Sequence, residues 1–277
     1  MNKRRFMSAH ERGVLYVASG HRFVEEACAS AESVKRHMPE LPVLLHTHDS
    51  VDHPAIDSVV TDHVTEDAEE AKAYKIDCMA ESPFERTLFL DTDTRVLDRA
   101  DELFDLLYAF DLGVAHAPNR LYFGDGEYPG KRDYPSDLPE CFPEMNTGVM
   151  VYDSESASVQ SLFRAWQDRY ETMREFGATR DQISFREVLY NSDVRFSVLP
   201  PEYNCRSEFP VYLEGAVKID HARHPDSQFA ERVLNETTLR RTRRPWMFEV
   251  KPFNRIRGFY RYLKKELRTF LLPWTTS

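Results

Sequence analysis

The stretch Arg86-Thr87-Leu88-Phe89-Leu90-Asp91-Thr92-Asp93-Thr94 decides the fold of this 277-residue chain. Its first five residues are β-compatible and too few for a helix, so they predict a short buried strand. Two carboxylates, Asp91 and Asp93, follow where that strand ends. Once the chain turns, alternate residues can converge on one ligand at the carboxyl edge of a sheet, which is where open α/β sheets bind ligands.

A pair of carboxylates at such an edge suits a hard divalent cation. Mg²⁺ and Mn²⁺ take oxygen ligands, and one or two carboxylates commonly bridge such an ion to a diphosphate. Asp is also a frequent turn and N-cap residue, so an Asp-x-Asp pair in an acidic protein can arise without any metal role. The pair therefore predicts a metal site only if other stretches supply the remaining parts.

A strand–helix–strand unit precedes the carboxylate pair. Residues 13–19 predict a buried strand, residues 21–38 a helix, and residues 43–45 the next strand. Such a unit predicts a parallel sheet. The first turn, at Ala18 and Ser19, is small and polar, which suits a ligand at the N-terminus of the helix. It has no G-x-G-x-x-G pattern, so a dinucleotide-binding fold is not indicated.

The rest of the chain continues this alternation. The sequence predicts strands at 58–64, 111–117, 145–153, 194–199 and 217–220, and helices at 67–79, 100–110, 156–176 and 182–190. Segment 118–144 is rich in Pro, Gly, Tyr and Asp and has no clear period, which is typical of a functional loop. Together these elements predict an α/β domain over residues 1–237, with helices flanking a mostly parallel sheet.

Charge and cysteine content restrict the function classes. The net charge of −10 argues against a general nucleic-acid binder. Cys28, Cys78, Cys141 and Cys205 form no close pair, so we expect no zinc site, no redox motif and a reducing, cytoplasmic compartment. No run of 18 apolar residues exists, and the basic N-terminus lacks the apolar core of a signal peptide.

A basic extension, residues 238–277, follows the predicted domain. It holds eleven Lys or Arg and two Glu, a net charge of +9, against −19 for the remainder of the chain. Apolar residues recur there at helical steps, namely Phe253, Ile256, Tyr260, Leu263, Leu267 and Phe270. Such a helix suits an anionic membrane surface, here on the inner face of the membrane. The alternative is a helix that packs on the domain with its cationic face in solvent.

In this order the motifs resemble those of the GT-A nucleotide-sugar glycosyltransferases, especially the glycogenin-like and bacterial lipopolysaccharide galactosyltransferase group of the family 8 type. The motifs are the first strand through Ser19, Lys75, RTLFLDTDTRV (86–96), MNTGVMVYD (145–153), RDQISF (180–185) and VKIDHARH (217–224). The resemblance implies a GT-A-like, Rossmann-like sheet. It also implies transfer of a sugar from a nucleotide-sugar donor, a UDP-sugar. Attachment of the basic extension to a membrane would suit a glycan or lipid-linked acceptor.

The resemblance implies a role for each matching residue on the nucleotide side. Asp91 and Asp93 correspond to the pair that holds Mn²⁺, and Asp91 also reaches the ribose. His221 corresponds to the third metal ligand. Ala18 and Ser19 correspond to residues that hold the base and ribose.

On the sugar side, Asn146 corresponds to a residue that lines the sugar pocket, and Asp181 and Gln182 to a pair beneath the donor sugar. The chain departs from the family after His221. Where the family often has Gly and then Lys-Pro-Trp, this sequence reads His221-Ala222-Arg223-His224-Pro225. The diphosphate contact would therefore pass to Arg223 or His224.

The chemistry of sugar transfer requires the same groups, whether or not the resemblance is considered. A sugar transferase must stabilise a leaving diphosphate, and a cation held by Asp91, Asp93 and His221 would do so as a Lewis acid. Further positive charge could come from Lys75, Arg22 or Arg223. An inverting enzyme would need a carboxylate base, for which Asp181 is the candidate, whereas the resemblance leans toward retention.

Plainer interpretations stay open for several of these residues. Lys75 can be a solvated helix charge, Asp181 an N-cap, and His221 a structural histidine. A haloacid-dehalogenase-like phosphohydrolase also has a strand that ends in Asp-x-Asp, but it expects Thr or Val where this chain has Arg95. A nucleotidyltransferase would need a Gly-rich basic loop after the first strand, and only Gly20-His21-Arg22 partly matches such a loop. A nucleotide-sugar-binding protein without catalysis would tolerate loss of either aspartate.

Overall fold

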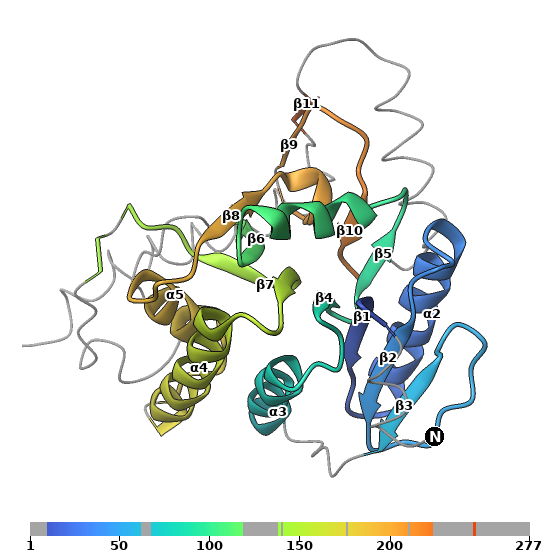
Figure 1. Ribbon diagram of the computed structural model, residues 1–277, viewed down its shortest axis with the longest axis horizontal. Helices are drawn as coiled ribbons and strands as arrows, with labels where there is room; N and C mark the ends of the chain where they lie inside the picture. The colour runs from blue at the N-terminus through green and yellow to red at the C-terminus, as the bar shows by residue number, and fades with distance from the viewer. Residues whose placement is uncertain are drawn as a thin grey trace, which may run out of the picture.

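A seven-stranded sheet in the order β3-β2-β1-β4-β7-β6-β8 forms the centre of the protein (Figure 1). The computed structural model describes residues 10–61, 68–118, 138–139, 141–175, 177–209, 211–223 and 246–247. The strands of the large sheet are β1 Arg12–Val17, β2 Val43–Thr47, β3 Ser58–Thr61, β4 Arg86–Leu90, β6 Leu112–His116, β7 Met145–Asp153 and β8 Phe196–Leu199. Two short pairs add to it, β5 Thr94–Val96 with β10 Ile219–His221 and β9 Tyr212–Leu213 with β11 Trp246–Met247.

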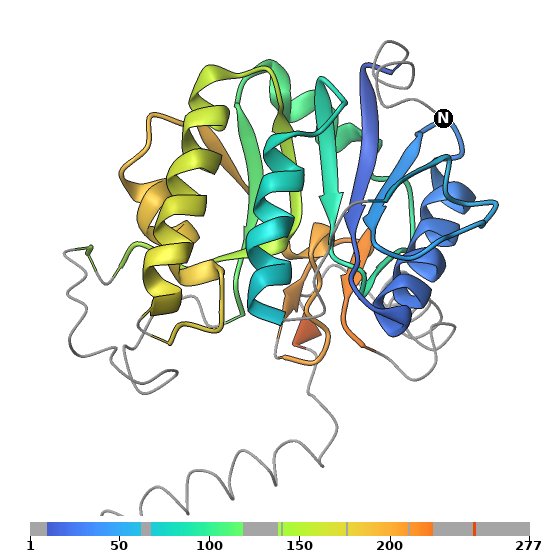
Figure 2. The ribbon, with the colours of Figure 1, turned by 90° about the horizontal axis from the view of Figure 1, so that it is seen from below.

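Helices cover both faces of the large sheet. The α-helices are α2 His21–His37, α3 Ala68–Ala80, α4 Ala157–Glu175 and α5 Gln182–Tyr190, and the 3₁₀ helices are η1 Asp101–Tyr108 and η3 Pro201–Tyr203. Helix α2 and η1 lie on one face, and α3, α4 and α5 lie on the other (Figures 1 and 2). The predicted α/β architecture with flanking helices is thus confirmed. One element differs in type, because the helix expected at 100–110 is a 3₁₀ helix.

The central strands β1, β4 and β7 are largely buried because both faces of the sheet are covered. On β4, Leu88 and Leu90 pack in the core beneath α2 and η1, whereas Phe89 packs in the core beneath α3, α4 and α5. All three side chains are fully buried. Successive residues of a strand face opposite sides, so one short apolar run contributes to two cores and fixes the register of β4.

Strand β7 is the exception to the parallel pattern. It runs antiparallel to both β4 and β6, whereas the other four strand pairs of the large sheet are parallel. As a consequence, the start of β7 lies beside the end of β4. Leu90 pairs with Val149, and the backbone N–H of Asp91 donates to the carbonyl of Gly148 at 2.7 Å. The reversed strand therefore brings the MNTG segment to the two aspartates.

The pair β5–β10 completes the same edge. After Asp91 the chain turns, and Thr94 of β5 then lies opposite His221 of β10. Cys205 flanks β10 on its other side, donating to Ile219 and accepting from the backbone N–H of His221, both at 2.9 Å. The strand predicted at 217–220 is therefore displaced toward the C-terminus, so that it includes His221 itself.

Several predictions fall outside the described residues. They are the domain boundary near 237, the membrane-binding helix within 238–277, the role of His224 and most of the loop 118–144. Within the predicted extension, Trp246 and Met247 form β11 and pair with β9. Among the helices that the structure describes, none combines the length and the apolar character needed to cross a bilayer.

Candidate active site

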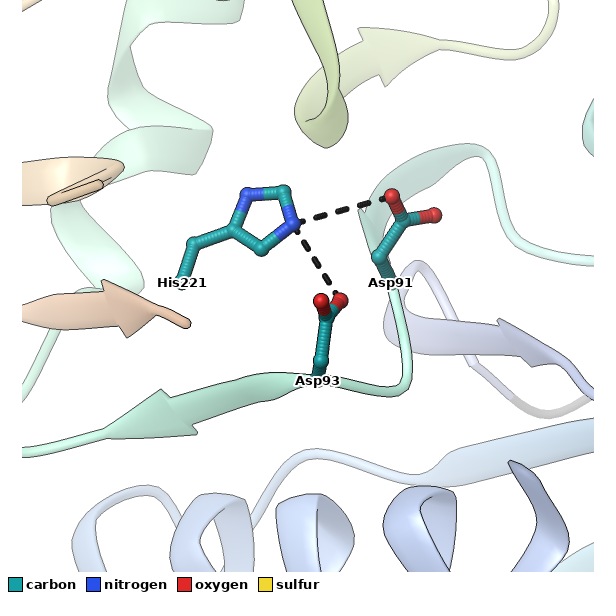
Figure 3. Close-up of side chains that lie close together, drawn as sticks. All are labelled: Asp91, Asp93 and His221. Atoms are coloured by element: carbon teal, nitrogen blue, oxygen red, sulfur yellow. Dashed lines mark ion pairs between the residues drawn. The ribbon is translucent and has the colours of Figure 1, made fainter. Parts of the chain in front are cut away.

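Asp91, Asp93 and His221 converge beyond the carboxyl end of β4 (Figure 3). Each offers one ligand atom, and the three atoms lie within 4.8 Å of one another. The Nε2 atom of His221 is 3.7 Å from Asp91 Oδ2 and 3.2 Å from Asp93 Oδ1. Two carboxylate oxygens and an imidazole nitrogen form a donor set that suits a divalent cation such as Mn²⁺.

Gly148 leaves the space that this cluster occupies. A Cβ atom at this position would lie 2.1 Å from His221 Cε1 and 2.6 Å from Asp91 Oδ2. Both separations are far shorter than any van der Waals contact, so a side chain here would displace two of the three candidate ligands. Steric exclusion therefore explains why residue 148 is a glycine. The three side chains that occupy the space fit a divalent cation.

A chain of buried amides fixes the orientation of the histidine. The backbone N–H of Gly148 donates to Asn146 Oδ1 at 3.1 Å, and Asn204 Nδ2 donates to the same oxygen at 2.9 Å. This leaves Asn204 Oδ1 as the acceptor, 2.8 Å from His221 Nδ1. Nδ1 therefore carries a proton, and the unprotonated Nε2 faces the carboxylates as a metal ligand requires.

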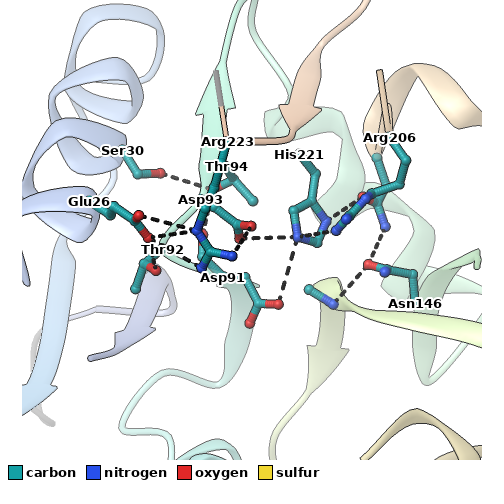
Figure 4. Close-up of polar contacts among 12 residues, drawn as sticks. Glu26, Ser30, Asp91, Thr92, Asp93, Thr94, Asn146, Arg206, His221 and Arg223 are labelled. Carbon is teal, nitrogen blue, oxygen red and sulfur yellow. Dashed lines mark hydrogen bonds and ion pairs between the residues drawn. The ribbon is translucent and has the colours of Figure 1, made fainter. Parts of the chain in front are cut away.

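Two guanidinium groups lie against the cluster (Figure 4). Arg206 Nη1 is 2.9 Å from His221 Nε2 and can only donate there. Arg223 donates to Glu26 at 3.2 Å and lies 3.6 Å from Asp93 Oδ2. Burial by itself would raise the pKa of Asp93, but its polar and cationic neighbours, Arg223 and Arg206 among them, outweigh burial, so the pKa lies well below its usual range. Asp93 is therefore ionised.

A second charged cluster lies next to the first. Lys75 Nζ is 2.6 Å from Asp181 Oδ2 and 3.9 Å from Asp91 Oδ1, and only 12% of its side chain is exposed. Thr147 Oγ1 donates to Asp181 Oδ2 at 3.1 Å. Burial opposes charge on both partners, yet their attraction prevails: the pKa of Lys75 is raised and the pKa of Asp181 is lowered. Both groups therefore stay charged.

Asp91 lies between the two clusters and behaves differently from its neighbours. Burial raises its pKa, and the nearby charge of Lys75 offsets this only in part. The pKa values of Asp91 and Asp93 thus shift in opposite directions, although the residues are two positions apart.

One cavity of about 700 Å³ unites these groups, a size that suits a small ligand. The predicted site residues that line it are Ala18, Ser19, Lys75, Asp91, Asp93, Asn146, Asp181, Gln182, His221 and Arg223. Arg22 is not among its lining residues, because its exposed side chain turns to Glu26 on the next turn of α2. Lining residues that the sequence did not suggest include Phe23, Lys72, Arg180, Arg206 and Phe209.

No protein-family model and no curated protein matches the sequence. Among solved structures, the apo-form glycosyltransferase GlyE of Streptococcus pneumoniae TIGR4 aligns with a TM-score of 0.53 and 18% identity, over 78% of this chain and 55% of GlyE. The bifunctional glycosyltransferase WbbM aligns with a TM-score of 0.50 and 15% identity, over 72% of this chain and 40% of WbbM. The galactosyltransferase LgtC aligns with a TM-score of 0.49 and 14% identity, over 77% of this chain and 87% of LgtC.

The chain has the GT-A glycosyltransferase fold. It spans about half the length of GlyE and less than half of WbbM. Within this GT-A fold, the Asp-x-Asp segment lies where the sequence analysis expected it, at the carboxyl edge of the sheet.

Two of the plainer interpretations do not hold in the GT-A fold. Asp181 precedes α5, but its side chain makes no capping hydrogen bond and reaches Lys75 instead. Lys75 is not a solvated helix charge, because α3 packs against α4 and the sheet and thereby encloses it. Gln182, the first residue of α5, accepts from the guanidinium of Arg180 at the wall of the cavity.

Sequence reasoning missed Asn204 and Arg206. Both follow η3 in a stretch with no period, so no local pattern marked them. Their place depends on the bridge between Cys205 and Asp220, which is a contact between distant segments. The one local signal was polarity, since Asn and Arg flank a buried cysteine between two prolines and a histidine-bearing strand.

Proposed function

We propose that this protein is a metal-dependent glycosyltransferase. It would move a sugar from a nucleotide-diphosphate donor, a UDP-sugar, to a glycan or lipid-linked glycan acceptor. The observation that carries the proposal is the Asp91–Asp93–His221 cluster, which shares one cavity with the Lys75–Asp181 pair at the carboxyl edge of a GT-A sheet. Ligands of open α/β sheets bind at this edge.

On the nucleotide side, Asp91, Asp93 and His221 would hold Mn²⁺ or Mg²⁺ through carboxylate oxygens and Nε2. When bound, the ion would neutralise the leaving diphosphate as a Lewis acid. Ala18 and Ser19 lie between β1 and α2 and line the cavity, in support of contacts with the base and ribose.

On the sugar side, we assign Lys75 and Gln182 to the donor sugar. Asp181 is a poor general base, because its pKa is lowered and Lys75 already engages Oδ2. Its role is to hold Lys75 in place. Asn146 acts through its amide bonds to Gly148 and Asn204, which brace the metal side.

The described residues that line the cavity include no spare carboxylate, which favours retention of configuration at the anomeric carbon. Among the described residues that line the cavity, the carboxylates are Asp91, Asp93 and Asp181. The first two belong to the cation cluster and the third to Lys75. An inverting reaction needs an available base, so we expect the product to keep the donor's anomeric configuration.

For the acceptor, we propose that the basic extension 238–277 binds an anionic membrane surface from the cytoplasmic side. Its eleven Lys or Arg and its apolar helical period support this. A lipid-linked acceptor would then lie within reach of the cavity.

Thermal unfolding with a panel of nucleoside diphosphates, each with Mn²⁺ or with a chelator, tests the proposal. A ligand at about 100 times its dissociation constant stabilises by roughly 2.7 kcal/mol. We expect UDP with Mn²⁺ to raise the melting temperature, and we expect the chelator or Asp93→Asn to abolish the rise. No shift with any nucleotide, together with hydrolysis of a phosphomonoester, would favour a phosphohydrolase instead.

A further inference from the structure

Arg206 is a partly enclosed cation that forms no ion pair with a described residue, although its charge contributes to the lowered pKa of Asp93. Its Nε–H is buried and, within those residues, has no hydrogen-bond partner, and no carboxylate there forms an ion pair with it. Other arginines that line the cavity are neutralised, Arg223 by Glu26 and Arg180 by Glu144. A shielded charge and an unpaired buried donor are both unfavourable, so this guanidinium indicates a missing anionic ligand.

The backbone holds Arg206 beside the cation cluster. The preceding residue, Cys205, forms backbone hydrogen bonds with Ile219 and His221 of β10, on both sides of Asp220. The guanidinium lies 5.8 Å from the ring centroid of Phe209, which also lines the cavity. Figure 4 shows it on the opposite side of His221 from Asp93. Its one side-chain acceptor among the described residues is His221 Nε2, at 2.9 Å.

That contact cannot persist when His221 ligates a cation. An imidazole nitrogen has a single lone pair, and Nδ1 already carries the proton given to Asn204. Arg206 must therefore release Nε2 and find another acceptor. A guanidinium presents parallel N–H groups that match two phosphate oxygens, and its unpaired Nε–H is one of them.

We propose that Arg206 binds the donor diphosphate, and that it exchanges partners to do so: it donates to His221 Nε2 in the cation-free protein and to diphosphate oxygens in the loaded one. This inference rests on the proposed function, since a nucleotide-sugar supplies the diphosphate. It gives the diphosphate a basic partner in place of the lysine of the Lys-Pro-Trp that the family often has after this histidine.

The exchange predicts opposite effects on two binding steps. Arg206 competes for Nε2 and adds positive charge, so it weakens binding of the cation alone. It also contacts the diphosphate, so it strengthens binding of the cation and diphosphate together. Removing the guanidinium should therefore tighten the first step and loosen the second.

Arg206→Gln tests this in the full-length protein. Mn²⁺ binding is followed by electron paramagnetic resonance of the free ion, first alone and then with inorganic pyrophosphate. We expect the variant to bind Mn²⁺ alone more tightly than wild type, and pyrophosphate in the presence of Mn²⁺ about tenfold more weakly. The control, Arg164→Gln, removes the same charge from the exposed face of α4, where the guanidinium contacts Ser161. It should match wild type in both measurements.

Equal weakening of both steps, unchanged pyrophosphate affinity, or no pyrophosphate binding by wild type would each overturn the inference. Arg206→Lys, which keeps the charge and loses the fork, should bind pyrophosphate with intermediate affinity if Arg206→Gln is poorly folded. The outcomes also separate the two proposals. If UDP with Mn²⁺ stabilises wild type but Arg206→Gln leaves the pyrophosphate affinity unchanged, the inference on Arg206 is refuted and the proposed function is not. If pyrophosphate binding depends on Arg206 but no nucleoside diphosphate stabilises the protein, the proposed function is refuted and Arg206 remains a diphosphate-binding residue.

Discussion

Two charged clusters share the cavity, and their charges are balanced differently. In the first, Lys75 and Asp181 form a 2.6 Å ion pair, and Thr147 adds a hydrogen bond, so each charge has its partner within the chain. In the second, Asp91 and Asp93 surround the lone pair of His221 Nε2. The cations near this cluster are Arg206, Arg223 and Lys75, which donate hydrogen bonds and cannot replace a metal ion as the centre of the three ligands.

The difference separates residues that hold other side chains in place from residues that bind a ligand. Lys75 and Asp181 balance each other's charge without any ligand, and the attraction lowers the pKa of Asp181. A carboxylate that stays incompletely compensated has a raised pKa, as burial causes at Asp91. The charge of Asp181 is therefore compensated within the chain, whereas the charge of Asp91 is compensated only in part.

The largest effect should come from breaking the first cluster. Lys75→Met leaves the charge of Asp181 enclosed and unpaired, which costs about 3–5 kcal/mol. Urea unfolding measures the loss. The double variant Lys75→Met/Asp181→Leu should recover most of it, because it removes the stranded charge. A single-variant loss below about 1 kcal/mol would mean that the pair behaves as a surface ion pair.

Gly148→Ala should destroy the second cluster while leaving the first in place. The new Cβ would strike His221 Cε1 and Asp91 Oδ2, so we expect the Mn²⁺-dependent stabilisation, about 2.7 kcal/mol at 100 times the dissociation constant, to disappear. Calorimetric unfolding with and without Mn²⁺ and UDP measures this. Gly215→Ala is the matched control, since its Cβ would meet nothing closer than 3.7 Å. Retained stabilisation in Gly148→Ala would refute the cluster as the cation site.

Asn204→Ala should weaken the second cluster without collapsing it. His221 loses the acceptor that holds the proton on Nδ1, and loss of such a partner typically lowers metal affinity 10–100-fold. Mn²⁺ titration gives the affinity, and ¹⁵N spectra of the metal-free protein report which imidazole nitrogen is protonated. Asn191→Ala, at the end of α5, should change neither. Unchanged spectra in Asn204→Ala would show that the amide does not set the tautomer.

Asp91→Asn should give a smaller change of opposite sign in the metal-free protein. Because the folded-state pKa of Asp91 is raised, its ionised form opposes folding above the unfolded pKa, near pH 4. The variant should therefore be up to about 1 kcal/mol more stable than wild type at pH 7, and the gain should vanish below about pH 4. Asp181→Asn should instead destabilise at pH 7, with a loss that fades as pH falls. Urea unfolding across pH compares them.

Arg22→Gln should have the smallest effect. Its side chain is 70% exposed and pairs with Glu26 outside the cavity lining. Stability should change by less than about 0.5 kcal/mol, and UDP affinity in the presence of Mn²⁺ by less than about twofold. A large loss of UDP affinity, read by calorimetry, would return Arg22 to the nucleotide site that the sequence suggested.

The sequence predicted those parts of the molecule that a local pattern records. Strand β4 and its two aspartates were readable because an apolar run of β-compatible residues stops at a pair of carboxylates. The first strand–helix–strand unit was readable because a segment with the helical period of 3.6 lies between two short apolar runs. The direction of β7 was not, because a strand covered on both faces is apolar whichever way it runs.

The sequence predicted which residues form the cation cluster, but not the contacts that hold them in place. Asp91, Asp93 and His221 were named from motifs, and the structure brings them together. Lys75 was named too, but its enclosure arises from the packing of α3 on distant elements, which no local pattern contains. Asn204 and Arg206 owe their roles to a bridge between segments, and their own stretch has no period to mark it.

The pairing of β5 with β10 has a consequence for how the protein is made. Thr94 and His221 face each other, so the cluster joins a segment synthesised early to one synthesised late. At 5–20 residues per second, Asp93 leaves the ribosome roughly 6–26 s before His221. Every strand from β1 to β8 has been synthesised before the third ligand appears. A nascent or prematurely terminated chain can therefore contain every strand of the large sheet and still lack a complete cation cluster.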